Sequence, residues 1–200
     1  MLEVFPAART REVEAGWEDR WRAFHRPVRV GPLWVGPPWE SAPTDAVAVV
    51  VDPGRAFGTG AHPTTRLCLE LLLAEERGSV LDVGCGSGVL AIAAAKLGHA
   101  PVVAVDVDPS AVAATRANAM RNGVAVDARR VDVLDAGLPA VKLALANIAL
   151  DVVEALGARL DVGRLVTSGH LDTDLPSVSG YDRLERRELD GWAADVHGRR

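Results

Sequence analysis

Between residues 62 and 169, short apolar runs alternate with longer segments in which apolar residues recur at helical spacing. The short runs are rich in Val, Leu and Ala, have the length of strands and are bounded by polar residues or glycine. We expect strands at 79–84, 101–107, 126–131, 143–148 and 164–169, and helices at 62–76, 89–98, 109–123 and 150–160. Strands that alternate with helices of this length form βαβ units, so the pattern predicts an α/β fold with a parallel sheet and helices on both faces.

The C-terminal part of the chain departs from this alternation. Within the segment 181–199, residue types alternate along the chain on both sides of Asp190 and Gly191, as they do in strands. An Asp-Gly pair between two such runs is typical of a hairpin with a type I′ turn, because both central residues of that turn have positive φ. The sequence therefore predicts an antiparallel pair of strands that closes one edge of the sheet.

The N-terminal part has a composition of its own, with four of the five Trp residues before position 45. Residues 11–24 place apolar side chains on one stripe of a charged helix, which predicts packing on the core or, as the alternative, a partner-binding face. Two β-branched runs follow, at 28–36 and 46–52, and are interpreted as strands. We expect a short N-terminal helix and strand segment at 1–45 and a main domain at 46–200.

The turn after the first main strand contains three glycines at every second position, Gly84, Gly86 and Gly88. In a doubly wound sheet the ligand lies beyond the carboxyl ends of the strands, where this turn makes the closest approach. Glycine adopts positive φ readily and lets the backbone approach a ligand that a side chain would exclude. These glycines either contact a ligand or only build a tight turn.

An acidic residue at the end of the second strand favours the ligand interpretation. Asp106 lies 22 residues beyond Gly84, where a carboxylate can accept hydrogen bonds from both hydroxyls of a ribose. Asp108 fits better as a helix cap before Pro109. Together, the turn and Asp106 predict a ligand of the adenosine type.

The spacing of the glycines distinguishes between adenosine ligands. A dinucleotide fingerprint would require a small residue where Val89 stands, and the turn has no basic residue to meet a pyrophosphate. A neutral to acidic turn suits a cofactor that carries a sulfonium and an amino acid. Asp82 precedes the glycines and could accept a hydrogen bond from that amino group, or could only fix the turn.

With LDVGCGSGVLAIAAAKLG at 81–98 and AVDVDPSAV at 104–112, the chain resembles the class I S-adenosylmethionine-dependent methyltransferases. VDPGRAFGTGAHPTTRLCLELL at 51–72, NAMRNGV at 118–124 and ANI at 146–148 are similar, more narrowly, to the ribosomal protein L11 methyltransferase (PrmA) family, whose members methylate protein amino groups. The resemblance implies a Rossmann-like, doubly wound, mostly parallel sheet of seven strands with a C-terminal antiparallel hairpin. It also implies S-adenosylmethionine as the cofactor.

The resemblance assigns roles to individual residues by their position in these motifs. It implies that Thr65, Gly84, Asp106 and Asn147 contact the cofactor, and that Phe57 lies against it. The assignments to Gly84 and Asp106 agree with the interpretation of their chemistry given above. Without the resemblance, an N-terminal helix cap or a hydroxyl in the first turn of a helix would equally explain Thr65.

Methyl transfer to an amine requires alignment with the methyl donor and a deprotonated nucleophile, but no covalent intermediate. Asn147 ends the strand at 143–148, where its amide oxygen could accept a hydrogen bond from the amine and orient the lone pair. We therefore expect Asn147 to be the catalytic residue; the alternative is a polar residue in a turn.

Composition limits the classes of molecule that the chain could bind. The 200 residues carry a formal net charge of -5, which argues against direct nucleic-acid binding. No apolar run has the length of a membrane span. Cys68 and Cys85 are isolated, without a CxxC motif or a His at metal-ligand spacing, so we expect neither a disulfide framework nor a metal site. We expect a cytoplasmic enzyme that methylates a lysine or N-terminal amine of a protein, by resemblance a ribosomal protein.

Other functions remain open at this point. Family members commonly carry an N-terminal recognition domain, and only about sixteen residues precede Trp17 here, so another protein or a small-molecule amine is an alternative acceptor. A non-catalytic S-adenosylmethionine-binding subunit and an NAD-dependent oxidoreductase are further alternatives. The sequence does not determine the oligomeric state or the number of methyl groups transferred.

Overall fold

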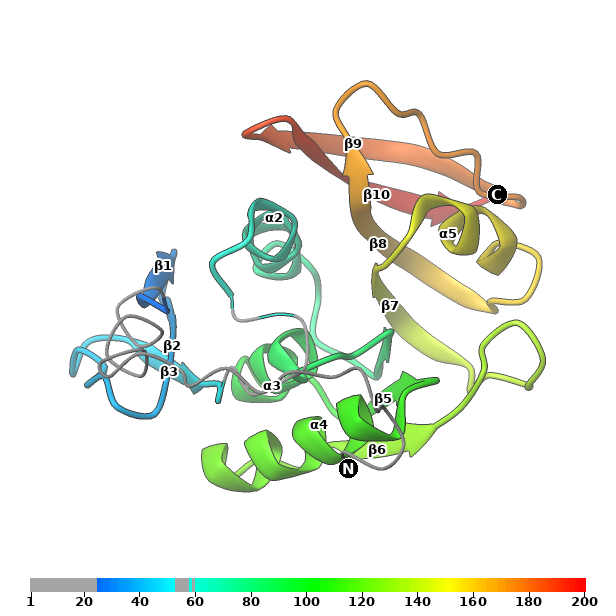
Figure 1. Cartoon of the computed structure of the whole chain (residues 1–200). Helices are drawn as coiled ribbons and strands as arrows, with labels where there is room; N and C mark the ends of the chain where they lie inside the picture. The colour runs from blue at the N-terminus through cyan, green and yellow to red at the C-terminus, as the bar shows by residue number, and fades with distance from the viewer. Residues whose placement is uncertain (1–24, 53–57, 59) are drawn as a thin grey trace, which may run out of the picture.

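The computed structural model describes residues 25–52, 58 and 60–200. A seven-stranded sheet in the order β6-β5-β4-β7-β8-β10-β9 runs through the molecule (Figure 1). Its first five strands are parallel, and β10 is antiparallel to both of its neighbours. The strands are β4 Val80–Val83, β5 Val102–Asp106, β6 Asp127–Arg130, β7 Val141–Asn147, β8 Val162–Leu171, β9 Tyr181–Leu189 and β10 Trp192–Arg199. This architecture confirms the predicted fold class.

Helices cover both faces of the sheet, as the alternating pattern predicts. The helices are α2 Pro63–Leu72, α3 Val89–Lys96, α4 Pro109–Asn122 and α5 Leu150–Leu156. One apolar cluster joins α2, α3 and α4 to one face, while α5 packs in a second cluster on the other face (Figure 1). Each helix ends within a few residues of its predicted limit. The 3.6-residue period identifies the helical segments well but locates their last turns less exactly.

The C-terminal hairpin is confirmed. β9 and β10 pair in register through Leu189 and Trp192, and the two residues between them, Asp190 and Gly191, have φ of 50° and 80°. Two central residues with positive φ are what a type I′ turn requires. The hairpin adds to β8 and forms one edge of the large sheet.

A second, three-stranded sheet lies outside the helices. It contains β1 Val28–Val30, β2 Leu33–Gly36 and β3 Val47–Val50 in this order. The run predicted as one strand at 28–36 is two antiparallel strands, because Gly31 has φ of 54° and Pro32 follows it in the turn. β3, which the sequence places with the main domain, pairs in parallel with β2.

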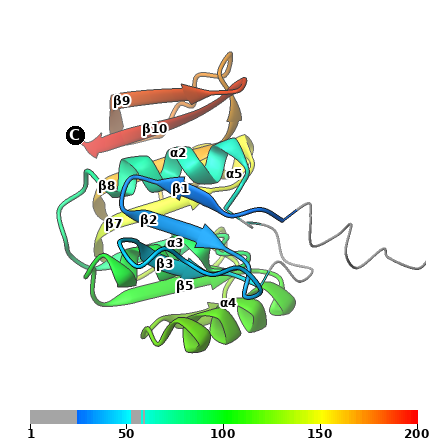
Figure 2. The same cartoon turned by 90° about the vertical axis from the view of Figure 1, so that its left-hand side faces the viewer.

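The small sheet shares its core with the large one. Leu33 and Val35 of β2 lie in the same apolar cluster as Leu67 of α2 and Ile92 of α3. Figure 2 looks onto this sheet, with α2 and α3 behind it. Helices α2 and α3 are therefore packed between the two sheets.

Candidate functional site

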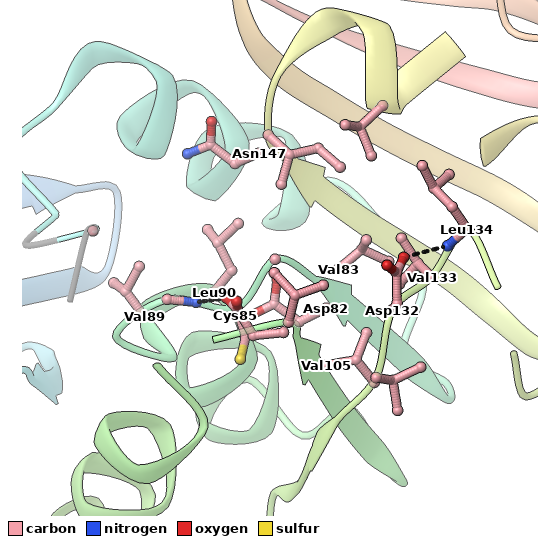
Figure 3. A pocket seen from close by; sticks show the side chains of 18 of the residues that line it. Asp82, Val83, Cys85, Val89, Leu90, Val105, Asp132, Val133, Leu134 and Asn147 are labelled. Carbon is pink, nitrogen blue, oxygen red and sulfur yellow. Dashed lines mark hydrogen bonds between the residues drawn. The ribbon is translucent and has the colours of Figure 1, made fainter. Parts of the chain in front are cut away.

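A cavity of about 470 Å³ lies at the carboxyl ends of the parallel strands. Its wall includes the glycine turn after β4, the end of β5, the turn after β6 and the end of β7 (Figure 3). The strand order reverses between β4 and β7, so the cavity occupies the crevice where doubly wound folds bind their ligands.

The glycine turn forms the floor of this cavity, and Gly84 and Gly86 both line it. Gly84 has φ of 69°, and a Cβ there would lie 2.2 Å from Cγ2 of Ile148. The backbone therefore needs glycine at this position for its conformation and for the close approach of Ile148.

Asp106 at the end of β5 contacts the turn directly. Its Oδ2 accepts a hydrogen bond from the Gly86 backbone N–H at 3.0 Å, and its Oδ1 accepts one from the Asp108 N–H at 3.0 Å. Asp108 instead caps α4 by accepting from the Ser110 N–H at 2.8 Å, as the sequence predicts. Asp106 thus lines the cavity and fixes the turn, whereas Asp108 belongs to the helix end.

Asp82 is the buried acid of the site. Its carboxylate accepts a hydrogen bond from the Ala91 N–H at 3.0 Å, which ties β4 to the first turn of α3. Burial raises the pKa of Asp82 to about 7; the Ala91 bond opposes this rise and the charge of Asp106 adds to it. The bond supports the role in fixing the turn, while a contact to a cofactor amino group stays a prediction.

Thr65 and Asn147 are 82 residues apart in sequence and meet at the cavity. The Asn147 Nδ2 donates to the Thr65 Oγ1 at 3.4 Å, and both residues line the cavity. The side chain that caps α2 is that of His62, which accepts from the Thr64 N–H. Thr65 is therefore not the N-cap, and its hydroxyl is turned to the end of β7.

One wall of the cavity was missed by the sequence analysis. Val131, Val133 and Leu134 line it after β6, together with Asp132, whose Oδ1 accepts from the Leu134 N–H at 2.9 Å. The strand is predicted to end at 131, and the residues that line the cavity, 131–134, include no glycine to mark them. The parallel arrangement of β6 beside β5 could have indicated that residues after β6 reach the same edge.

Phe57 and the helix predicted at 11–24 lie outside the described residues. In the described part of the chain, no group of His, Cys, Asp and Glu is arranged to hold a metal ion. Cys68 and Cys85 are buried free thiols. None of the helices described has the length and apolar character needed to cross a membrane.

Comparison with known proteins gives consistent matches. The family described as ribosomal protein L11 methyltransferase (PrmA) matches residues 3–191. A ribosomal protein L11 methyltransferase of Aliivibrio fischeri is 43% identical over 190 residues, which are 87% of this chain and 62% of the relative. One from Methylococcus capsulatus is 47% identical over 194 residues, covering 88% of this chain and 65% of the relative. The chain thus spans less than two thirds of these relatives.

Solved structures show the same fold. The crystal structure of a ribosomal protein L11 methylase from Lactobacillus delbrueckii subsp. bulgaricus superposes with a TM-score of 0.76 and 30% identity, over 88% of this chain and all of that one. An RNA methyltransferase from Salinibacter ruber in complex with S-adenosyl-L-homocysteine gives a TM-score of 0.52 and 25% identity over 64% of this chain and 85% of its own. Since the family match extends over nearly the whole sequence, this chain belongs to the ribosomal protein L11 methyltransferase (PrmA) family.

Proposed function

We propose that this chain is an S-adenosylmethionine-dependent methyltransferase that transfers methyl groups to amino groups of a protein, with ribosomal protein L11 as the acceptor indicated by the family. One observation carries the proposal. The glycine turn, Asp106 and the Asn147–Thr65 pair, which are separated in sequence, line a single cavity at the switch point of the sheet.

The chemistry of the lining fits this cofactor better than a dinucleotide. The described lining residues include the carboxylates of Asp82, Asp106 and Asp132 but neither Lys nor Arg. A pyrophosphate would lack a positive partner there, whereas a cofactor with a sulfonium and an amino group is complementary to the acids. The apolar wall at Val131 and Val133 suits the face of an adenine ring.

We assign the residues of the cavity as follows. Asp106 accepts from the ribose hydroxyls, the Gly84 and Gly86 backbone approaches the amino acid part, and Asp82 accepts from its amino group. When bound, S-adenosylmethionine supplies an electrophilic methyl group. Phe57 keeps the role that the family resemblance implies.

The residues of the chain must orient an amine and favour its neutral form. The Asn147 Nδ2 is a donor and is directed to Thr65, and the Oδ1 is the atom of this side chain that can accept from an incoming amine. A free lysine has a pKa of about 10.4, and an apolar surrounding such as Leu90, Ile148 and Val152 disfavours the charged form. An amine held by Asn147 then presents its lone pair in line with the methyl group.

Two measurements test the proposal. Calorimetry should show binding of S-adenosylmethionine and S-adenosylhomocysteine and none of NAD. Incubation of the chain with methyl-labelled cofactor and purified L11 should then label L11. Binding of NAD alone would refute the methyltransferase assignment. If the chain labels another protein when a lysate replaces purified L11, and labels no L11, the proposed acceptor is refuted. Cofactor binding without any methyl transfer would indicate a non-catalytic subunit.

The cellular location follows from the acceptor and is part of the same proposal. Ribosomal proteins are made and assembled in the cytoplasm of bacteria, so we infer a cytoplasmic enzyme. We also propose that 46–200 is the methyltransferase domain and 1–45 an N-terminal segment, although β3 pairs with the small sheet.

A further inference from the structure

The motif NAMRNGV at 118–124 does not line the cavity, yet it contains two buried amides on one side of α4. Asn118 and Asn122 are 2% and 9% exposed and stand four residues apart, so their side chains lie on the same helix face. Buried amides are costly unless both ends of the group are hydrogen-bonded. The partners of these two side chains differ, and the difference indicates separate roles.

Asn122 completes the open edge of β3. Its Oδ1 accepts from the Val50 N–H at 2.9 Å, and its Nδ2 donates to the Val50 carbonyl at 2.7 Å and to the Asn118 carbonyl at 2.8 Å. β3 is the last strand of the small sheet, so the amide pairs with backbone groups that a further strand would otherwise satisfy. Asn122 therefore anchors β3 to α4, and the hydrogen bonds of its side chain go to Val50 and Asn118 and not to the glycine turn.

Asn118 connects Asp52, two residues beyond β3, to the glycine turn. Its Oδ1 accepts from the Asp52 N–H at 3.1 Å, and its Nδ2 donates to the Ser87 carbonyl at 3.0 Å. One turn earlier on α4, the Thr115 Oγ1 donates to the Gly86 carbonyl at 3.1 Å. Two successive carbonyls of the turn are thus held by the same helix.

The direction of these carbonyls matters for the cavity. In a trans peptide the C=O and the following N–H point in opposite directions. When Thr115 draws the Gly86 carbonyl toward α4, the N–H of Ser87 is directed away from α4. The Gly86 N–H itself donates to Asp106. The Gly88 N–H, which follows the Ser87 carbonyl, donates to the Cys85 carbonyl at 2.7 Å. The α4 contacts therefore fix the orientation of the peptides directly after the part of the turn, Gly84 to Gly86, that lines the cavity.

We propose that Asn118 and Thr115 are positioning residues for the cofactor, which act by holding the carbonyls of Ser87 and Gly86 on α4. This inference rests on the proposed function, since the ligand of the turn is the cofactor assigned above. Neither Asn118 nor Thr115 lines the cavity. Their contribution is the conformation of the turn before binding, so that binding requires no rearrangement of it.

A matched pair of variants separates this role from a general effect on stability. Asn118→Asp and Asn122→Asp both replace a buried amide donor by an acceptor that faces a carbonyl, and both keep the acceptor oxygen, for the Asp52 N–H and the Val50 N–H respectively. Only Asn118→Asp places the repulsion on the glycine turn. We expect it to weaken S-adenosylmethionine binding about tenfold or more, while Asn122→Asp lowers the melting temperature and leaves the dissociation constant within about twofold.

A second pair keeps the test decisive if Asn118→Asp does not fold. Thr115→Val removes the hydroxyl that donates to Gly86, and Thr115→Ser keeps it. Calorimetry on the folded chains should show weaker cofactor binding for Thr115→Val and near-parent binding for Thr115→Ser. Parent-like binding by Thr115→Val, or an equal loss of affinity in both Asn variants, would overturn the inference. A parent chain that does not bind the cofactor would refute the proposed function instead.

Discussion

Two aspartates that stand two residues apart allow a sharp test of the cofactor site. Asp106 lines the cavity and accepts from the Gly86 N–H, whereas Asp108 does not line it and caps α4 through Ser110. Asp106→Ala should weaken S-adenosylmethionine binding, and Asp108→Ala should not, although it removes the same charge from the same segment.

The magnitude follows from the bonds that Asp106→Ala would remove. The variant loses the acceptor for the Gly86 and Asp108 N–H groups, each at 3.0 Å, and, in the complex, a charged acceptor for the ribose hydroxyls. Leaving such groups without a charged partner costs about 1 to 3 kcal/mol, which corresponds to a dissociation constant roughly 5- to 150-fold higher. Asp106 is partly exposed, so water replaces part of the lost bonding and the lower half of this range is the expected result.

The assay is calorimetric titration of both variants, with the melting temperature of each measured in the same buffer. Asp108→Ala loses a helix cap and should melt at a lower temperature with parent-like affinity. Equal dissociation constants for Asp106→Ala and the parent would remove Asp106 from the site. Equal weakening by both variants would show that the net charge of the segment, and not the position of one carboxylate, attracts the cofactor.

Asn147→Ala should lower methyl transfer far more than cofactor affinity, and Asn147→Asp should retain more activity than Ala because it keeps the acceptor oxygen; parent rates for both would exclude the role. Because burial raises the pKa of Asp82 to about 7, its carboxylate form grows as the pH rises, so cofactor binding should tighten between about pH 6 and pH 8 and this dependence should vanish in Asp82→Asn. Burial also lowers the pKa of His197, whose Nε2 lies 3.0 Å from the Thr167 Oγ1. The contribution of His197 to the free energy of unfolding is therefore fully present above about pH 6.5 and is lost as the pH falls. In denaturant titrations, the difference in unfolding free energy between the parent and His197→Gln should shrink as the pH is lowered.

Periodicity and turn chemistry predicted the large sheet, because both are local properties. The alternation of strand and helix patterns identifies the βαβ units, and Asp190-Gly191 identifies the hairpin. The pairing of the strands in the small sheet could be predicted less well from the sequence. Whether β3 pairs with β2 or with the large sheet depends on Asn122 and the helix face beside it, which satisfy its outer edge from 72 residues away. No window of the sequence contains that information.

The same distinction applies to the site. Gly84 and Asp106, which both line the cavity, could be proposed from the sequence because each leaves a local trace, a missing side chain and a strand-end acid. The Asn147–Thr65 contact joins residues 82 apart, and the turn after β6 enters the cavity only because β6 pairs with β5. Asn118 is harder still to identify from the sequence, because it acts on the turn through the Ser87 carbonyl. A residue that touches a ligand can be recognised by its own chemistry, but a residue that positions another one can be recognised only from the three-dimensional contact. Variants of Asn118 therefore test the construction of this site more sharply than variants of residues that the sequence already identifies.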